Sequence, residues 1–216
     1  MEASQLLKWE KSLKLFAENP LAAAALIGVM LILLLFMRIR NIKLDAKIIA
    51  QIGMVLAMAT LLKTFRLYHL PQGGSVTLGS MVPILIIALG HGPWIGALTG
   101  FLYGIISFIM SPYVLHPVQV LFDYPLPFMA LGLAGIIREK PVWGTIVAVF
   151  GRFICHFISG AAFFASYAPK DMSPTTYSLM VNGVFMGVEG AICLAIISLL
   201  PLAQIKQLLL KPQKPA

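Results

Sequence analysis

Long apolar runs alternate with short polar connections along this chain. Seven runs reach, or nearly reach, the length of about 20 residues that a helix needs to cross a bilayer. The run at 77–90 is short for a full span, so we expect it to be tilted or partly interfacial. The pattern predicts an all-α polytopic membrane protein. The runs cover roughly residues 20–37, 46–65, 77–90, 93–111, 117–137, 142–168 and 175–201.

The composition agrees with this pattern. Of the 216 residues, 59% are hydrophobic and 11% are charged, whereas soluble domains carry about 25% charged residues. The sequence contains no G-x-x-x-x-G-K-[ST] phosphate loop, so an ATP-driven role would need separate subunits. It also contains neither G-x-S-x-G nor H-E-x-x-H. We therefore expect no enzyme activity.

The basic residues predict the orientation in the membrane. The net charge is +8, and it is dispersed over helix ends, which fits anionic lipid and cytoplasmic flanks rather than nucleic acid. Three basic groups, at 38–47, 138–140 and 206–214, fall on one side if all seven runs cross, and this side should be cytoplasmic. The connections at 65–76 and 111–116 then lie outside, together with 167–176 and the N-terminus.

Two smaller features complete this outline. The first apolar run ends in Arg38 and Arg40 with no cleavage pattern, so we expect a retained helix rather than a signal peptide. Cys155 and Cys193 both fall in apolar segments. They are typical of small core residues rather than of a disulfide or a metal site. We predict no metal and no cofactor.

Asp123 is the most informative polar residue. It lies in an apolar run, where a carboxylate costs about 2.5–3.5 kcal/mol on insertion scales. It therefore needs a partner, and a bound cation would serve. Its aromatic neighbour Tyr124 favours a small ligand as that partner.

Three further ionisable residues lie within the apolar runs. Arg152 and His156 are four positions apart and share one helical face. We expect Arg152 to snorkel toward the cytoplasm in a structural role, whereas His156 is either a pocket residue or bonded to a neighbour. Glu189 is expected to pair with a basic group or with a helix backbone, and substrate binding is the alternative.

Aromatic and amide side chains gather toward the predicted outer side. With Asp123 and Tyr124 they predict an outward-facing pocket for an organic cation or a flat heteroaromatic ring. An interfacial aromatic belt without a ligand is the alternative. The residues are Phe163, Phe164, Tyr167, Tyr177 and Asn182.

Two sets of small residues predict close helix contacts. Gly92, Gly96, Gly100 and Gly104 recur every four positions, which favours packing inside the bundle over docking of another subunit. The pair Gly53–Ala57 leaves these two interpretations equal on the residues alone.

The order of these motifs resembles one family over roughly residues 46–202. That family is the thiamine-specific substrate-binding (S) components of energy-coupling-factor (ECF) vitamin transporters. Two departures stand out, because Phe164 replaces a ring-stacking tryptophan and Asp123 replaces a glutamate of one family member. The segments that carry the resemblance are 74–85, 90–93, 116–128, 152–160, 164–169 and 177–183.

The resemblance implies a six-helix S-component bundle with a pocket on the extracellular side. The first apolar run would then be an extra N-terminal transmembrane helix. We accordingly expect residues 1–45 to hold a polar segment and this helix, 46–203 to form the substrate-binding membrane domain, and 204–216 to be a basic cytoplasmic tail. The protein would reside in the bacterial plasma membrane as a multi-pass subunit.

The resemblance also implies roles for single residues. Asp123 would pair with the thiazolium charge of thiamine, Tyr124, Phe164 and Tyr177 would flank its rings, and His156 and Asn182 would form hydrogen bonds with it. Gly53 and Ala57 would meet a transmembrane coupling subunit, which in turn works with two ATP-binding subunits. The Phe65–Gly74 connection would close over the site.

Three alternatives stay open on the sequence. The chain could bind a thiamine precursor or another vitamin as an S component. It could be a stand-alone ion- or proton-coupled transporter that uses Asp123, His156 and Glu189. It could also be a membrane enzyme or assembly factor without a soluble ligand.

Overall fold

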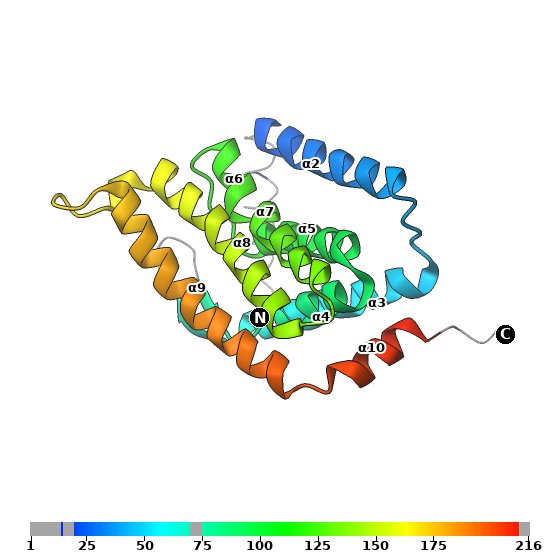
Figure 1. The fold of residues 1–216 in the computed structure, drawn as a ribbon. Helices are drawn as coiled ribbons and strands as arrows, with labels where there is room; N and C mark the ends of the chain where they lie inside the picture. Colours follow the sequence, from blue (N-terminus) through cyan, green and yellow to red (C-terminus); the bar gives the residue numbers. More distant parts are fainter. Residues whose placement is uncertain (1–13, 15–19, 70–74, 212–216) are drawn as a thin grey trace, which may run out of the picture.

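The computed structural model describes residue 14 and residues 20–69 and 75–211, and helices dominate it (Figure 1). Five segments are long and apolar enough to cross a membrane: 46–64, 93–110, 117–136, 141–163 and 174–199. The helices are α2 (Pro20–Ile39), α3 (Ala46–Thr64), α4 (Val82–His91), α5 (Pro93–Met110), α6 (Pro117–Asp123), α7 (Pro125–Met129), η1 (Ala130–Ile136), α8 (Pro141–Phe163), η2 (Ala165–Tyr167), α9 (Pro174–Leu199) and α10 (Leu202–Leu210).

One of the predicted spans is shorter than expected, since helix α4 has only 10 residues. Helix α2 has 20 residues. The count of six bundle helices plus one extra helix therefore stays a prediction. Helix α2 lies along α6 and α5, at the edge of the bundle (Figure 1).

The all-α prediction was wrong for the connection between α3 and α4. Strands β1 (Arg66–His69) and β2 (Ser75–Thr77) pair antiparallel, with Tyr68 opposite Val76. Valine, threonine and tyrosine favour extended backbone, so this connection forms a hairpin rather than an irregular loop. Residues 70–74 lie outside the described residues, so the closure of the Phe65–Gly74 connection over the site stays a prediction.

The predicted span at 117–137 is interrupted. It consists of α6, α7 and η1 in succession, and the first break falls at Tyr124. Pro125 and Pro127 have no backbone N–H and fix φ, so they begin a new helix and a regular helix cannot continue from α6 through them. The interruption leaves Asp123 at the C-terminal end of α6, next to the break.

The glycine stripe of α5 packs inside the bundle, as predicted. A Cβ atom on Gly100 would lie 2.0 Å from the carbonyl oxygen of Phe128, and one on Gly104 would lie 2.6 Å from that of Tyr124. Only glycine lets α5 approach the backbone of α7 this closely. Tyr103, in the same helix, packs edge-on against Phe128 with 4.7 Å between ring centroids.

Members of all three predicted basic groups meet at α10, whose place in the fold Figure 1 shows. Lys206 donates to the carbonyl of Arg138, and Lys47 donates to that of Lys211. These contacts agree with the prediction that the three groups share one side, and which side of the membrane this is stays a prediction. The residues after 201 also form a helix that the sequence analysis missed: α10 packs on α4, with Leu209 over Gly90.

Candidate functional site

One cavity of about 150 Å³ lies between α5, the α6–α7 break, α8, α9 and the hairpin. This is about ten times the volume that a single water molecule requires. All six residues predicted to bind a ligand line it, and so do side chains that the sequence analysis did not assign. The six are Asp123, Tyr124, His156, Phe164, Tyr177 and Asn182.

The Asp123 carboxylate faces this cavity at the end of α6. Its side chain is 18% exposed, and its Oδ1 lies 3.7 Å from Nδ1 of His156. Its Oδ2 accepts a hydrogen bond from Gln119, one turn earlier on α6. Among the described residues, no lysine or arginine lies within 4.0 Å of the carboxylate. The protein thus holds Asp123 in place without neutralising it by a full ion pair.

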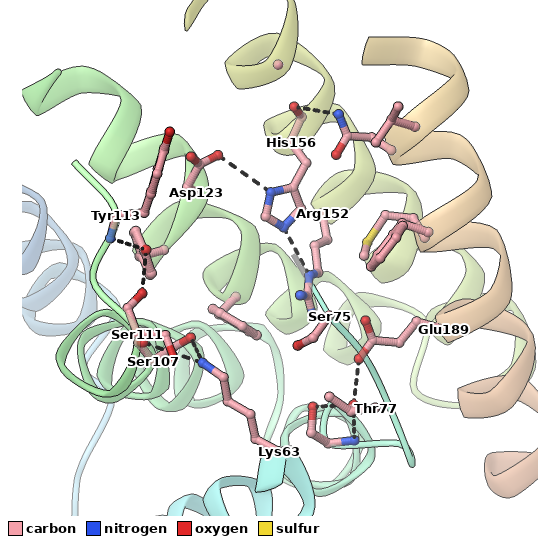
Figure 2. A pocket seen from close by; sticks show the side chains of 18 of the residues that line it. Lys63, Ser75, Thr77, Ser107, Ser111, Tyr113, Asp123, Arg152, His156 and Glu189 are labelled. Carbon is pink, nitrogen blue, oxygen red and sulfur yellow. Dashed lines mark hydrogen bonds and ion pairs between the residues drawn. The ribbon is translucent and has the colours of Figure 1, made fainter. Parts of the chain in front are cut away.

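His156 and Arg152 share one face of α8, as predicted, and both line the cavity (Figure 2). Nε of Arg152 lies 3.4 Å from Nε2 of His156. A guanidinium group only donates, so Nε2 accepts and the proton of the neutral ring sits on Nδ1, toward Asp123. The expectation that Arg152 snorkels was wrong, because its guanidinium lies 4.3 Å over the Phe128 ring and the residue is 7% exposed.

An aromatic wall lines the end of the cavity next to the α5–α6 and α8–α9 connections. Phe164 stacks on Tyr113 with 5.9 Å between ring centroids and 21° between the planes. The Tyr113 hydroxyl contacts that of Tyr167, and this hydrogen bond raises the pKa of Tyr113 to about 12. The Tyr124 hydroxyl donates to the carbonyl of Ser111 at 2.8 Å and accepts from N–H of Tyr113 at 2.9 Å. Tyr124 therefore holds the connection that carries Tyr113.

Asn182 and Tyr177 enter the cavity from α9. The Asn182 amide nitrogen donates to the carbonyl and the hydroxyl of Ser178, both at 3.1 Å, and to the carbonyl of His156 at 3.3 Å. A Cβ on Gly160 would lie 2.3 Å from the Ser178 hydroxyl. The close contact of α8 and α9 thus depends on a glycine that also lines the cavity.

The opposite, inner part of the cavity carries two further charged side chains, Glu189 and Lys63 (Figure 2). Glu189 is 1% exposed, and its Oε1 accepts from the Thr77 hydroxyl at 2.8 Å. The expectation that it pairs with a basic group or a helix backbone was wrong, because β2 brings Thr77 against α9. Lys63 donates to the hydroxyl of Ser107 and reaches the carbonyl of the same residue at 3.4 Å.

Comparison with known proteins identifies the family. The sequence profile of the family described as "Thiamine transporter protein" matches residues 49–209. The chain is 36% identical over 148 residues to "Thiamine transporter ThiT" of Bacillus subtilis, covering 61% of this chain and 77% of that protein. It is 32% identical over 123 residues to the protein of the same name from Lacticaseibacillus paracasei, which covers 48% of this chain and 61% of that protein.

A solved structure shares the fold. The chain superposes on ThiT from Listeria monocytogenes with a TM-score of 0.63 and 22% sequence identity, over 74% of this chain and 96% of that one. The resemblance that the motifs indicated is thus confirmed, and the chain is a multi-pass protein of the cell membrane rather than an enzyme. It belongs to the thiamine transporter protein family.

Proposed function

We propose that this chain captures thiamine in the cavity from the extracellular side and passes it on with the help of separate subunits. The observation that carries the proposal is the shared cavity of Asp123 and the aromatic wall. A carboxylate that is partly open to the cavity suits the permanent positive charge of a thiazolium ring. The relatives' name, "Thiamine transporter ThiT", supports this choice of ligand.

The other lining residues have roles that follow from their placement. Phe164 and Tyr177 flank a flat ring, and Tyr124 supports this wall by holding the connection at Ser111. His156 offers its ring and Asn182 its amide to the polar atoms of the ligand. Aromatic faces and a few convergent polar groups are the usual composition of a small-molecule site.

Extracellular access is supported by the distance between the cavity and the basic end. Helix α8 begins at Pro141, near Arg138 at the basic end, and ends at Phe163, next to the aromatic wall. Its 23 residues span about 34 Å at 1.5 Å per residue, close to the thickness of the hydrocarbon core. Because basic groups favour the cytoplasm, the aromatic wall at the opposite end of α8 faces the extracellular side.

The proposed docking face lies on α3. Gly53 and Ala57 are both exposed, and a Cβ on Gly53 would meet no atom within 4 Å. Met54, Met58 and Leu61 are exposed on the same helix at 62%, 49% and 62%. A small-residue face next to large apolar side chains suits a transmembrane helix of a coupling subunit, which would join two ATP-binding subunits.

Gly53→Leu should abolish co-purification with such a subunit and leave ligand affinity unchanged. Retained co-purification would show that this face of α3 is not the docking site.

Calorimetry on the purified chain tests the ligand site. We expect wild type to bind thiamine, and Asp123→Asn to bind it at least about tenfold more weakly, because an amide cannot offset the ring charge. Asn182→Ala should also lower the affinity. Asp171→Asn, the same chemical change at an exposed position, serves as the control. Unchanged affinity in Asp123→Asn and Asn182→Ala would overturn the assignment of this pocket.

A further inference from the structure

Two buried side chains of opposite charge face the inner part of the cavity without pairing. Arg152 on α8 is 7% exposed and Glu189 on α9 is 1% exposed. Both line the cavity and point into it from facing helices (Figure 2). Among the described residues, Nη1 of Arg152 and Oε2 of Glu189 are buried with no hydrogen-bond partner. Burying a charged atom without a hydrogen-bond partner costs free energy.

The rest of each side chain is anchored, so the two free atoms are held apart. The Glu189 Oε1 atom accepts from Thr77 at 2.8 Å, and Thr77 itself is bonded to the Ser80 hydroxyl at 2.8 Å. The Arg152 guanidinium lies over Phe128 and directs Nε toward His156. Within the described part of the chain the two charges do not approach within 4.0 Å of each other. A bridging group between them would satisfy both.

The chemistry of the two free atoms restricts what that group is. Nη1 of Arg152 only donates, and Oε2 of the Glu189 carboxylate only accepts. A cation would face Arg152 at close range, and an anion would face Glu189. The complement is therefore an uncharged group that accepts one hydrogen bond and donates another.

We propose that Arg152 and Glu189 form an inner subsite that binds the uncharged donor–acceptor end of the ligand. The inference rests on the proposed function. It divides the pocket into two ends: Asp123 faces the positively charged ring, and the inner subsite binds a neutral group. Thiamine carries two groups of this kind, the terminal hydroxyl and the edge of the aminopyrimidine ring that bears the amino group. The inner subsite selects ligands by polarity rather than by net charge.

Glu189→Gln tests the inner subsite directly, because the hydrogen bond from Thr77 determines which atom of the new amide faces the cavity. Thr77 donates to Oε1, so the glutamine oxygen should take that position and its NH₂ group should replace Oε2. An acceptor in the cavity thereby becomes a donor with little change in shape. We expect thiamine to bind this variant about tenfold more weakly or worse, since a mismatched buried polar pair is strongly rejected.

The experiment is a calorimetric cycle with wild type, Glu189→Gln and three ligands. These are thiamine, an analogue without the terminal hydroxyl, and an analogue with oxygen in place of the pyrimidine amino group. If the hydroxyl is the group, the analogue without it binds both proteins equally within about twofold. If the amino group is, the oxygen analogue binds Glu189→Gln more tightly than wild type, because the new donor meets an acceptor. Arg152→Gln gives a second, independent cycle if Glu189→Gln does not fold by thermal melting, and the exposed Glu139→Gln is the matched control.

Two results overturn the inference. In the first, thiamine binds Glu189→Gln as tightly as wild type. In the second, the variant loses the same factor for all three ligands, which indicates a water-filled or purely structural pair. Either result leaves tight thiamine binding by wild type intact, whereas failure of wild type to bind thiamine at all would overturn the proposed function and this subsite together.

Discussion

Tyr124 illustrates how one side chain serves the site indirectly. Its ring lines the cavity, and it also packs edge-on against Phe108 with 4.8 Å between ring centroids. Its hydroxyl is occupied by Ser111 and Tyr113. The residue thus positions the connection after α5, and with it the ring of Tyr113 on which Phe164 stacks.

Tyr124→Phe separates these two contributions, because it keeps the ring and removes the hydroxyl. A backbone carbonyl and a backbone N–H then lose their partner, which should cost about 1–3 kcal/mol of stability. We expect a lower melting temperature and a severalfold weaker thiamine affinity. Tyr68→Phe, at a residue that is 60% exposed, is the control. A melting temperature equal to wild type would show that the hydroxyl does not hold the connection.

At the scale of elements, the site depends on an interrupted helix pressed against a continuous one. Prolines divide the segment at 117–136 into α6, α7 and η1, and the break aims Asp123 and Tyr124 at the cavity. Helix α5 packs against this break. Its glycines lie against backbone atoms of Tyr124, Pro125 and Phe128. Packing of this element therefore determines the geometry of the pocket.

Gly100→Ala should disturb this contact. The new methyl would lie 2.0 Å from the carbonyl oxygen of Phe128, so α5 and α7 must separate, at a cost of about 1–3 kcal/mol. Thermal unfolding should show the loss, and the thiamine affinity should fall because Phe128 lines the cavity.

Gly183→Ala is the matched comparison, since a Cβ there would meet no atom within 4 Å. In that variant the melting temperature should stay the same or rise, because alanine favours helix. Equal effects of the two substitutions would contradict the account of α5 packing.

On the scale of the whole molecule, the two ends have different chemistry. Arg138, Lys206 and the α10 helix gather at one end. The connections that carry Tyr113 and Tyr167 form the other end, next to the aromatic wall of the cavity. This division supports a cavity that fills from outside and a cytoplasmic face toward partner subunits.

Single cysteines in a chain whose Cys155 and Cys193 are replaced by alanine test this orientation. Lys140 and Lys170 are both exposed, one near each end. In intact cells, a membrane-impermeant thiol reagent should label Lys170→Cys and leave Lys140→Cys unlabelled, because only the first faces outward. Permeabilised cells should label both. The reverse pattern in intact cells would place the cavity on the cytoplasmic side.

Local patterns in the sequence were sufficient for several features of the fold and the site. Apolar runs located the long helices because lipid imposes length and composition on any span. The four-residue spacing of glycines predicted the packing of α5, and the spacing of Arg152 and His156 predicted their common face, since both follow from helix geometry alone. All six predicted ligand residues line one cavity, although their contact with a ligand stays a prediction.

Other features depended on contacts between residues far apart in the chain. The sequence did not reveal that Thr77 would hold Glu189, 112 positions away, or that Phe128 would keep Arg152 from the cytoplasmic side. The hairpin at 66–77 and the helix at 202–210 were missed as well. The sequence by itself determined which segments enter the membrane, because their free energy of transfer is a property of each segment. Only the tertiary structure decided which buried charges share a cavity, because such pairing depends on how separate helices pack.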